Sequence, residues 1–307
     1  MRSILRRLFR RRTAPGKMMK VTVRAETDTG RVRDHNEDYF AAFGGEESPP
    51  GVDALLVVAD GMGGHAAGEV ASKMAVEGIM QSLSSRGEEA SKLEGNAFGV
   101  FLGKVLEEAN QDVWRAGQES DKRGMGTTCT LAAIRDHQLF LAHIGDSRAY
   151  LLRGGELHQV SKDHSWVESA VDQGVITREQ ARTHPNRNVI TRAIGLDPQP
   201  EIDTYVMPLA EGDLLLLCSD GLNSMIPDED IHQILTSSGQ EEVCRALIDA
   251  ANDQGGHDNT TVVVATVGAR RKAPAATQPS ASDQDTQEMT ITSPWWKRVV
   301  RAILRRR

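Results

Sequence analysis

The sequence predicts an α+β fold in which layers of strands and helices pack on one another. Apolar runs of strand length follow each other in meander order, and helical patterns come in two blocks, whereas a doubly wound parallel sheet alternates strands and helices strictly. The predicted strands cover residues 53–59, 127–134, 138–144, 147–153, 213–218 and 260–267. The predicted helices cover residues 68–83, 97–117, 228–236 and 240–253.

Turn residues separate several of these strands. Asp136-His137 lies between two apolar runs, and Gly154-Gly155 is flanked by alternating sequence, which indicates a hairpin. The polar segment 165–196 interrupts the pattern, and we expect it to form an inserted, partly helical flap.

Charge divides the chain into parts. The net charge is −7, but residues 1–20 hold eight Lys/Arg and no acid, and residues 294–307 hold six and no acid. Without those +8 and +6 charges, residues 21–293 carry −21, which argues against nucleic-acid binding by the main body. We expect a basic arm at 1–20, a domain at 21–268, a disordered linker at 269–293 and a basic amphipathic tail at 294–307.

Neither end predicts a membrane-spanning segment, because no apolar run reaches the roughly 18 residues required. In the tail, Trp296, Val299 and Ile303 share one helical face opposite basic residues. Docking to the inner face of a membrane or to an acidic partner is one expectation, and autoinhibition or an inert tail is the alternative. Liposome co-sedimentation separates these readings. Translation from Met18 or Met19 would remove the arm.

The three cysteines are far apart and form no CxxC pair, so neither a disulfide framework nor a zinc ribbon is expected. Cys129 and Cys218 lie in strand-like runs, where burial as small apolar side chains is the better interpretation. A cytoplasmic monomer, with a peripheral membrane position as the alternative, fits this composition.

Four aspartates stand at the ends of apolar strands. Asp60, Asp146 and Asp220 each follow an apolar run, and Asp258 precedes one. Clustered carboxylates repel one another unless cations neutralise them. Oxygen ligands without a Cys/His set favour Mg²⁺ or Mn²⁺ over Zn²⁺. The alternative for each Asp-Gly pair is an ordinary turn, and the residues alone leave both readings open.

Six motifs carry a more specific signal. They are RDHNED (33–38), DGMGGH (60–65), GMGTT (124–128), GDSR (145–148), SDG (219–221) and GHDN (256–259). In order and spacing this set resembles the metal-dependent protein phosphatase family (type 2C), its bacterial branch most closely, over about residues 21–267. The resemblance implies a four-layer α-β-β-α sandwich with two central antiparallel sheets and a site at the edge of that sandwich.

The resemblance also implies a two-metal site. Asp60 would bridge both ions, and the carbonyl of Gly61 would bind one of them. Asp220 and Asp258 would complete the other position.

Further motif residues surround that pair of ions. By the same resemblance, Glu37 and Asp38 would order metal-bound waters, and Asp146 together with Asp220 would hold a third ion. Asn259 would support the geometry of Asp258 from behind.

The implied reaction is in-line attack on phosphorus by a metal-activated water, without a covalent intermediate. Arg33 would bind two phosphate oxygens, the alternative being a surface arginine. His65 is the candidate general acid. Three residues separate it from Asp60-Gly61, where the eukaryotic pattern has none, so a water of the metal site or a structural role for His65 is the alternative.

The flap holds further candidates. Asn188 is expected near the water shell of the third metal, and Arg187 or Arg192 near substrate; the alternative is that all three are solvated flap residues. Asp163-His164, at the flap entrance, is expected to be structural.

Together, the residues and the resemblance predict a protein serine/threonine phosphatase that uses two or three Mn²⁺ or Mg²⁺ ions. Its expected substrates are phosphorylated proteins, among them a bacterial Ser/Thr kinase or the targets of that kinase. A non-catalytic pseudophosphatase that only binds phosphoproteins, and a membrane-recruited scaffold, are the competing hypotheses.

Overall fold

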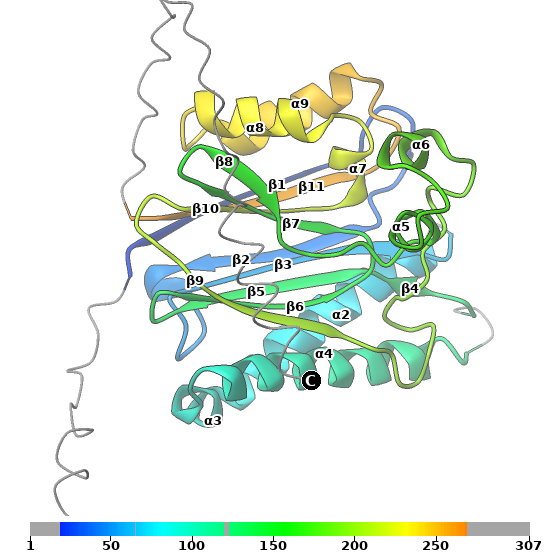
Figure 1. The fold of residues 1–307 in the computed structure, drawn as a ribbon. Helices are drawn as coiled ribbons and strands as arrows, with labels where there is room; N and C mark the ends of the chain where they lie inside the picture. Colours follow the sequence, from blue (N-terminus) through cyan, green and yellow to red (C-terminus); the bar gives the residue numbers. More distant parts are fainter. Residues whose placement is uncertain (1–18, 65, 120–122, 269–307) are drawn as a thin grey trace, which may run out of the picture. The chain divides into compact units, whose positions relative to one another are not determined.

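Two antiparallel β-sheets lie face to face at the centre of the protein (Figure 1). The computed structural model describes residues 19–64, 66–119 and 123–268. One sheet runs, in spatial order, β1 (Val21–Asp28), β11 (Thr260–Val267), β10 (Leu214–Cys218), β7 (Arg148–Arg153) and β8 (Glu156–Gln159). The other runs β2 (Asp38–Gly44), β3 (Ala54–Met62), β5 (Cys129–Arg135), β6 (Gln138–Ile144) and β9 (Asp203–Pro208), and the short β4 (Gly126–Thr127) pairs with β3.

Helices cover the outer face of each sheet. Helices α2 (Ala66–Ser85) and α4 (Asn96–Ala116), joined by the short α3 (Gly87–Lys92), pack on the sheet that contains β3. Helices α7 (Asp220–Asn223), α8 (Asp228–Ser237) and α9 (Val243–Asp253) pack on the sheet that contains β10. The layer order is α-β-β-α, so the predicted fold class is confirmed.

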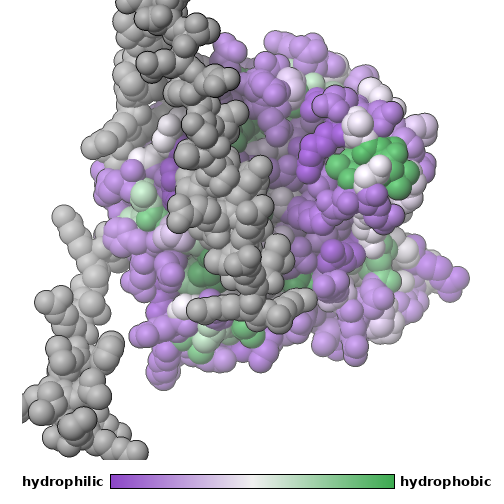
Figure 2. Space-filling view, in the orientation of Figure 1, coloured by the Kyte–Doolittle hydropathy of each residue, from purple (hydrophilic) through white to green (hydrophobic). Residues whose placement is uncertain are grey.

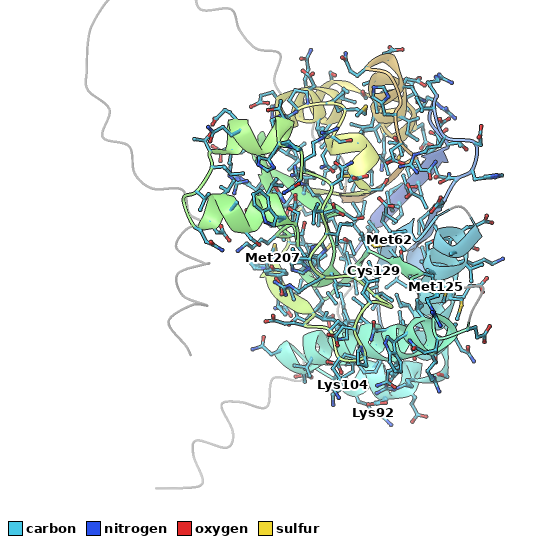
Figure 3. The ribbon with its side chains drawn as sticks, turned by 90° about the vertical axis from the view of Figure 1, so that its right-hand side faces the viewer. Met62, Lys92, Lys104, Met125, Cys129 and Met207 are labelled. Carbon is cyan, nitrogen blue, oxygen red and sulfur yellow. The ribbon has the colours of Figure 1, made fainter. Side chains whose placement is uncertain are left out.

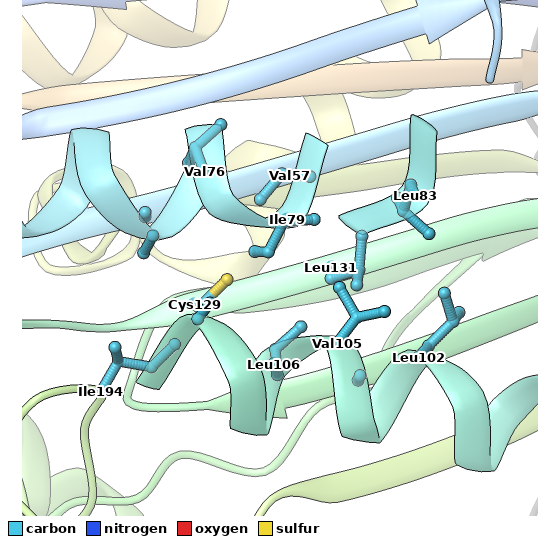
Figure 4. Close-up of a cluster of buried hydrophobic side chains, with 14 of the residues drawn as sticks. Val57, Val76, Ile79, Leu83, Leu102, Val105, Leu106, Cys129, Leu131 and Ile194 are labelled. Carbon is cyan, nitrogen blue, oxygen red and sulfur yellow. The ribbon is translucent and has the colours of Figure 1, made fainter. Parts of the chain in front are cut away.

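Buried side chains on β3 show why its sequence is continuously apolar. Leu55 and Val57 face α2 and α4, in the cluster that Figure 4 shows, whereas Leu56 and Val58 face the other sheet. A strand covered on both faces has no solvent side, so the alternation of apolar and polar residues disappears. The same holds for β10 and β11, whose residues are all buried.

The predicted turn at Asp136-His137 is confirmed, because both residues have positive φ (50° and 59°) and join β5 to β6. Gly154 and Gly155 likewise join β7 to β8. A difference appears between β6 and β7: although consecutive, they belong to different sheets. The turn at residues 145–147 therefore crosses from one sheet to the other.

The flap segment contains two short helices, α5 (Trp166–Asp172) and α6 (Arg178–Thr183). Sequence patterns did not indicate strand β9, which lies at a sheet edge and is only partly buried. The expected burial of Cys129 and Cys218 is confirmed.

In the part of the chain that the structure describes, no helix combines the length and apolarity needed to cross a bilayer. Residues 1–18 of the basic arm, the linker, the amphipathic tail and His65 lie outside the described residues.

Candidate active site

Five aspartates meet at one edge of the sandwich, where strands from both sheets end. Asp38 begins β2 and pairs in register with Asp60 on β3. Asp220 begins α7 directly after β10, Asp146 lies in the crossing turn between β6 and β7, and Asp258 stands two residues before β11. This is the edge near α7 and β4 in Figure 1. Figure 3 looks onto it, and Met62, the last residue of β3, lies between the flap helices and α2.

The pKa values of these carboxyls show how strongly they interact. Burial, and then the charges of Asp38 and Asp220, raise the pKa of Asp60 well above its usual range. Asp146 and Asp258 add to that increase. Burial also raises the pKa of Asp38 to about 7, and burial followed by the charge of Asp258 raises the pKa of Asp220 to about 6. At neutral pH the cluster therefore retains protons.

Protons and one arginine neutralise the cluster in this arrangement. Asp60 and Asp220 each affect the pKa of the other carboxyl, so the two side chains lie close together. Arg33 Nη2 donates to Asp258 Oδ2 over 2.7 Å, and its side chain remains 47% exposed. Arg33 thus reaches the cluster from the solvent side.

The oxygens of the cluster fit a hard divalent cation. Among the described residues, Asp38 Oδ1 and Asp146 Oδ1 are buried without a hydrogen-bond partner. A buried carboxylate oxygen without a partner is costly, and a cation removes that cost. In the described part of the chain, no group of three His, Cys, Asp or Glu side chains is arranged as it stands to hold a metal ion. The buried, unpaired oxygens of Asp38 and Asp146 and the raised pKa values of both carboxyls nevertheless fit a cation, because an ion of opposite charge would compensate both.

Asn259 organises the loop that carries Arg33 and Glu37. Asn259 is buried, with 4% of its surface exposed. Its side chain accepts a hydrogen bond from Glu37 N (2.8 Å) and donates to the carbonyls of Thr29 (3.0 Å) and His35 (2.8 Å). Only its backbone N–H reaches Asp258, at Oδ1 over 2.8 Å. The expected support of Asp258 thus comes from the backbone, and the side chain holds the loop.

Two glycines permit close backbone approaches beside the aspartates. A Cβ at Gly61 would lie 2.2 Å from the Gly68 carbonyl oxygen, and one at Gly221 would lie 2.0 Å from the Asn259 carbonyl oxygen. Any larger residue would separate the elements that bring the carboxylates together. Glu37 adjoins Gly61: its carbonyl accepts from Gly61 N over 3.1 Å, and its Oε2 faces Gly68 in the first turns of α2.

The comparison with family models decides the assignment. Residues 30–255 match the model described as protein phosphatase 2C. The chain belongs to the protein phosphatase 2C family.

Relatives with known structure or activity agree with this assignment. The serine/threonine phosphatase stp of Listeria monocytogenes is 40% identical over 240 residues, covering 78% of this chain and 92% of the relative. The S. agalactiae serine/threonine phosphatase is 36% identical, with a TM-score of 0.73 over 80% of this chain and 99% of that one. The catalytic domain of the phosphatase PstP in complex with two manganese ions is 37% identical, with a TM-score of 0.68 over 82% of this chain and 100% of that one.

This protein phosphatase 2C member is a metal-dependent serine/threonine phosphatase, and Mn²⁺ or Mg²⁺ is its cofactor, as the sequence predicted. These relatives give no support to the hypothesis of a non-catalytic phosphoprotein binder.

A cavity of about 220 Å³ opens beside the aspartates of this phosphatase, between the flap and α7. Asp146 and Asp220 line it together with the flap residues Arg187 and Asn188. Arg192 is not among the lining residues; its Nη1 donates to Asp203 Oδ1 over 3.1 Å. The substrate role of Arg192 stays a prediction that this ion pair does not favour.

Sequence reasoning missed two flap arginines that line the cavity. Arg178 pairs with Glu168 over 3.1 Å, whereas Arg182 forms no ion pair with any residue that the structure describes. Only the basic character of the flap could have indicated them. Figure 2 shows apolar surface on the side where the flap helices lie, and the large exposed hydrophobic residues of the flap are Trp166, Val175, Val189 and Leu196.

Proposed function

We propose that the five-aspartate edge is the catalytic metal site and that it hydrolyses phosphoserine and phosphothreonine esters in proteins. The single observation that supports this most directly is the convergence of Asp38, Asp60, Asp146, Asp220 and Asp258, whose charges together with burial raise the pKa values of the first four. Such a cluster is stable at neutral pH only if protons or cations neutralise it.

Each residue has a proposed part in holding the metals. Asp60 would be shared by two ions, with Asp220 and Asp258 on one side and the Gly61 carbonyl on the other. The remaining ligands, acting directly or through water, would be Glu37, Asp38 and, for a third ion, Asp146. The unpaired oxygens of Asp38 and Asp146 support their place in this set.

When bound, the cations supply an activated water and neutralise charge on the phosphoryl oxygens. Arg33 binds the substrate phosphate through its planar guanidinium, and its exposure at the rim of the cluster supports that role. Its bond to Asp258 fixes the orientation of the guanidinium, so the other N–H groups are directed to solvent, where the phosphate would enter. His65 remains the predicted proton donor to the leaving alkoxide.

The flap side of the cavity is proposed to receive the polypeptide around the phosphorylated residue. Arg187 and Asn188 of the flap line the same cavity as Asp146 and Asp220. Positive charge there suits acidic or phosphorylated segments.

The natural substrate is a further proposal. Phosphorylated proteins are the substrate class of the family, and we propose that they include a bacterial Ser/Thr kinase or the targets of that kinase. Phosphoproteomics after Asp60→Asn replacement tests this, since phosphosites unchanged by the replacement would rule it out. A cytoplasmic monomer with tail-mediated membrane or partner contact stays a prediction, because both ends lie outside the described residues.

Release of phosphate from a phosphothreonine peptide, measured with and without Mn²⁺, tests the proposed site. Asp220→Asn should lower the Mn²⁺-dependent rate by more than ~100-fold, because even residues behind metal ligands change metal affinity or activity by 10–100-fold. Asp230→Asn, an exposed position on α8, is the matched control and should keep the rate. Equal rates in the two variants would refute the assignment.

A further inference from the structure

The flap is joined to the domain by a narrow neck made of two segments. Ser165 pairs with Ile190, and Trp166 N donates to the Val189 carbonyl over 2.8 Å. Thr191 N donates to the His164 carbonyl over 2.8 Å. His164 is therefore the residue at which the neck meets the body of the protein.

His164 also holds the turn that carries Asp146. Its backbone N donates to the Gly145 carbonyl (2.8 Å), and its Nδ1 accepts from Gly145 N (3.1 Å). Because Nδ1 accepts, the proton of the neutral ring lies on Nε2. The side chain is 1% exposed, so no water competes for these contacts.

The Nε2 side of the ring faces an ionised carboxylate. Asp203 Oδ2 lies 3.4 Å from His164 Nε2 and accepts from Tyr205 Oη over 2.9 Å. Asp203 Oδ1 accepts from Arg192 Nη1 over 3.1 Å, and Arg192 stands at the far end of the neck. At 3.4 Å the His164 contact is too long for a full hydrogen bond, and among the described residues Nε2 has no other partner. Asp203 thus contacts both segments of the neck: it lies beside His164 at the start of the flap and binds Arg192 at its end.

The position of Gly145 affects the proposed metal site because the turn at residues 145–147 packs tightly against Thr128. Gly145 has φ +112°, and a Cβ there would lie 2.4 Å from the Thr128 side chain. Thr128 in turn accepts from Asp60 N over 3.0 Å and shares a hydrogen bond with Ser147 over 2.7 Å. A shift of Gly145 would displace Asp146 against Thr128.

We infer that His164 is a positioning residue with two separable parts: Nδ1 fixes the turn that carries Asp146, and Nε2 with Asp203 fixes the flap. The inference rests on the proposed function, because it assigns Asp146 to a metal. His164 does not contact substrate in this account. It sets the distance between the Asp146 turn and the flap wall of the cavity.

Two substitutions separate the two parts. His164→Asn keeps an acceptor oxygen near the Nδ1 position and loses the reach to Asp203. His164→Gln keeps an amide near the Nε2 position and loses the acceptor for Gly145 N. Mn²⁺ titration by calorimetry and hydrogen exchange of residues 166–190 are measured for both full-length variants.

The two variants should affect different measurements, His164→Gln the binding of Mn²⁺ and His164→Asn the exchange of flap amides. His164→Gln should weaken the Asp146-dependent Mn²⁺ site by roughly tenfold, the lower range for a residue behind a metal ligand, and lower kcat. His164→Asn should keep Mn²⁺ affinity, while flap amides exchange at least threefold faster and KM for a phosphopeptide rises. Unchanged Mn²⁺ binding in His164→Gln, or equal Mn²⁺ losses in both variants, would overturn the inference.

Two further variants complete the test. If neither His164 variant folds, Asp203→Asn decides, with faster flap exchange and unchanged Mn²⁺ affinity expected, and unchanged flap exchange contradicting the inference. Asp146→Asn is measured in parallel. If it keeps every Mn²⁺ ion, the proposed ligand role of Asp146 is wrong; if it loses an ion while His164→Gln does not, only the role of His164 is wrong.

Discussion

At the scale of single residues, the proposed metal site consists of carboxyl groups whose burial disfavours their ionised form. Asp38 accepts from Ser219 Oγ over 2.8 Å at one oxygen and leaves the other unpaired and buried. Burial raises its pKa to about 7, although the hydrogen bonds of Ser219 and Thr261 act in the opposite direction. Folding therefore stabilises the protonated form of Asp38 relative to the ionised form.

This raised pKa predicts how stability depends on pH when divalent ions are removed by a chelator. Between the unfolded pKa of about 3.9 and the folded pKa of about 7, the unfolded chain has released the proton that the folded protein retains. Stability should therefore fall as pH rises through this window, and Asp220 should add to the effect up to about pH 6. We expect the thermal midpoint of chelated protein to be higher at pH 6 than at pH 8.

Two controls accompany that measurement. Asp38→Asn should flatten the pH dependence, because the amide does not titrate. Added Mn²⁺ should raise the midpoint more at pH 8 than at pH 6, since it competes with fewer protons there. A chelated wild-type protein that is more stable at pH 8 than at pH 6, by an amount that Asp38→Asn does not change, would contradict this assignment of charge.

At the scale of elements, the ends of the strands place the carboxylates, and close backbone contacts at glycines set the distances between them. Helix α7 begins at Asp220, and Gly221 lets it approach the backbone just before β11, where Asp258 stands. The Asp220–Asp258 separation therefore depends on one contact between two backbones.

Gly221→Ala tests this contact. A Cβ 2.0 Å from the Asn259 carbonyl oxygen cannot be accommodated without a backbone shift, so we expect a loss of about 1–3 kcal/mol in the free energy of unfolding by urea. Mn²⁺ affinity should fall with it, because Asp220 moves relative to Asp258. The matched control is Gly78→Ala in α2, where the nearest atom is 3.9 Å away and stability should be kept or improved. Equal effects of the two substitutions on Mn²⁺ affinity would contradict the prediction.

The elements also show what sequence could predict. Strands such as β10 and β11 were predicted because both faces are buried, which leaves an uninterrupted apolar run. Strand β9 was missed because an edge strand needs few apolar residues, and the separation of β6 from β7 was missed because local patterns do not encode which sheet a strand joins. Four of the five aspartates were found by their places at strand ends, and Asp38 by its family motif. The contact between His164 and Asp203 joins residues 39 positions apart and has no local signal.

At the scale of the whole molecule, two sheets that end at one edge make an acidic protein able to act on phosphate. Residues 21–293 carry −21 charges, which would repel a phosphoprotein without local compensation. Arg33 and the flap arginines at the cavity provide part of it, and divalent ions at the five aspartates would reverse the local sign.

The most direct test is the number of Mn²⁺ ions that the chelated, full-length protein binds in a calorimetric titration at pH 7.5, compared with Asp60→Asn. We expect at least two ions for the wild type and the loss of at least one in the variant, with the thermal midpoint in chelator kept or raised. If the wild type binds fewer than two ions, or the variant binds as many with the same affinity, these aspartates are not the catalytic metal site.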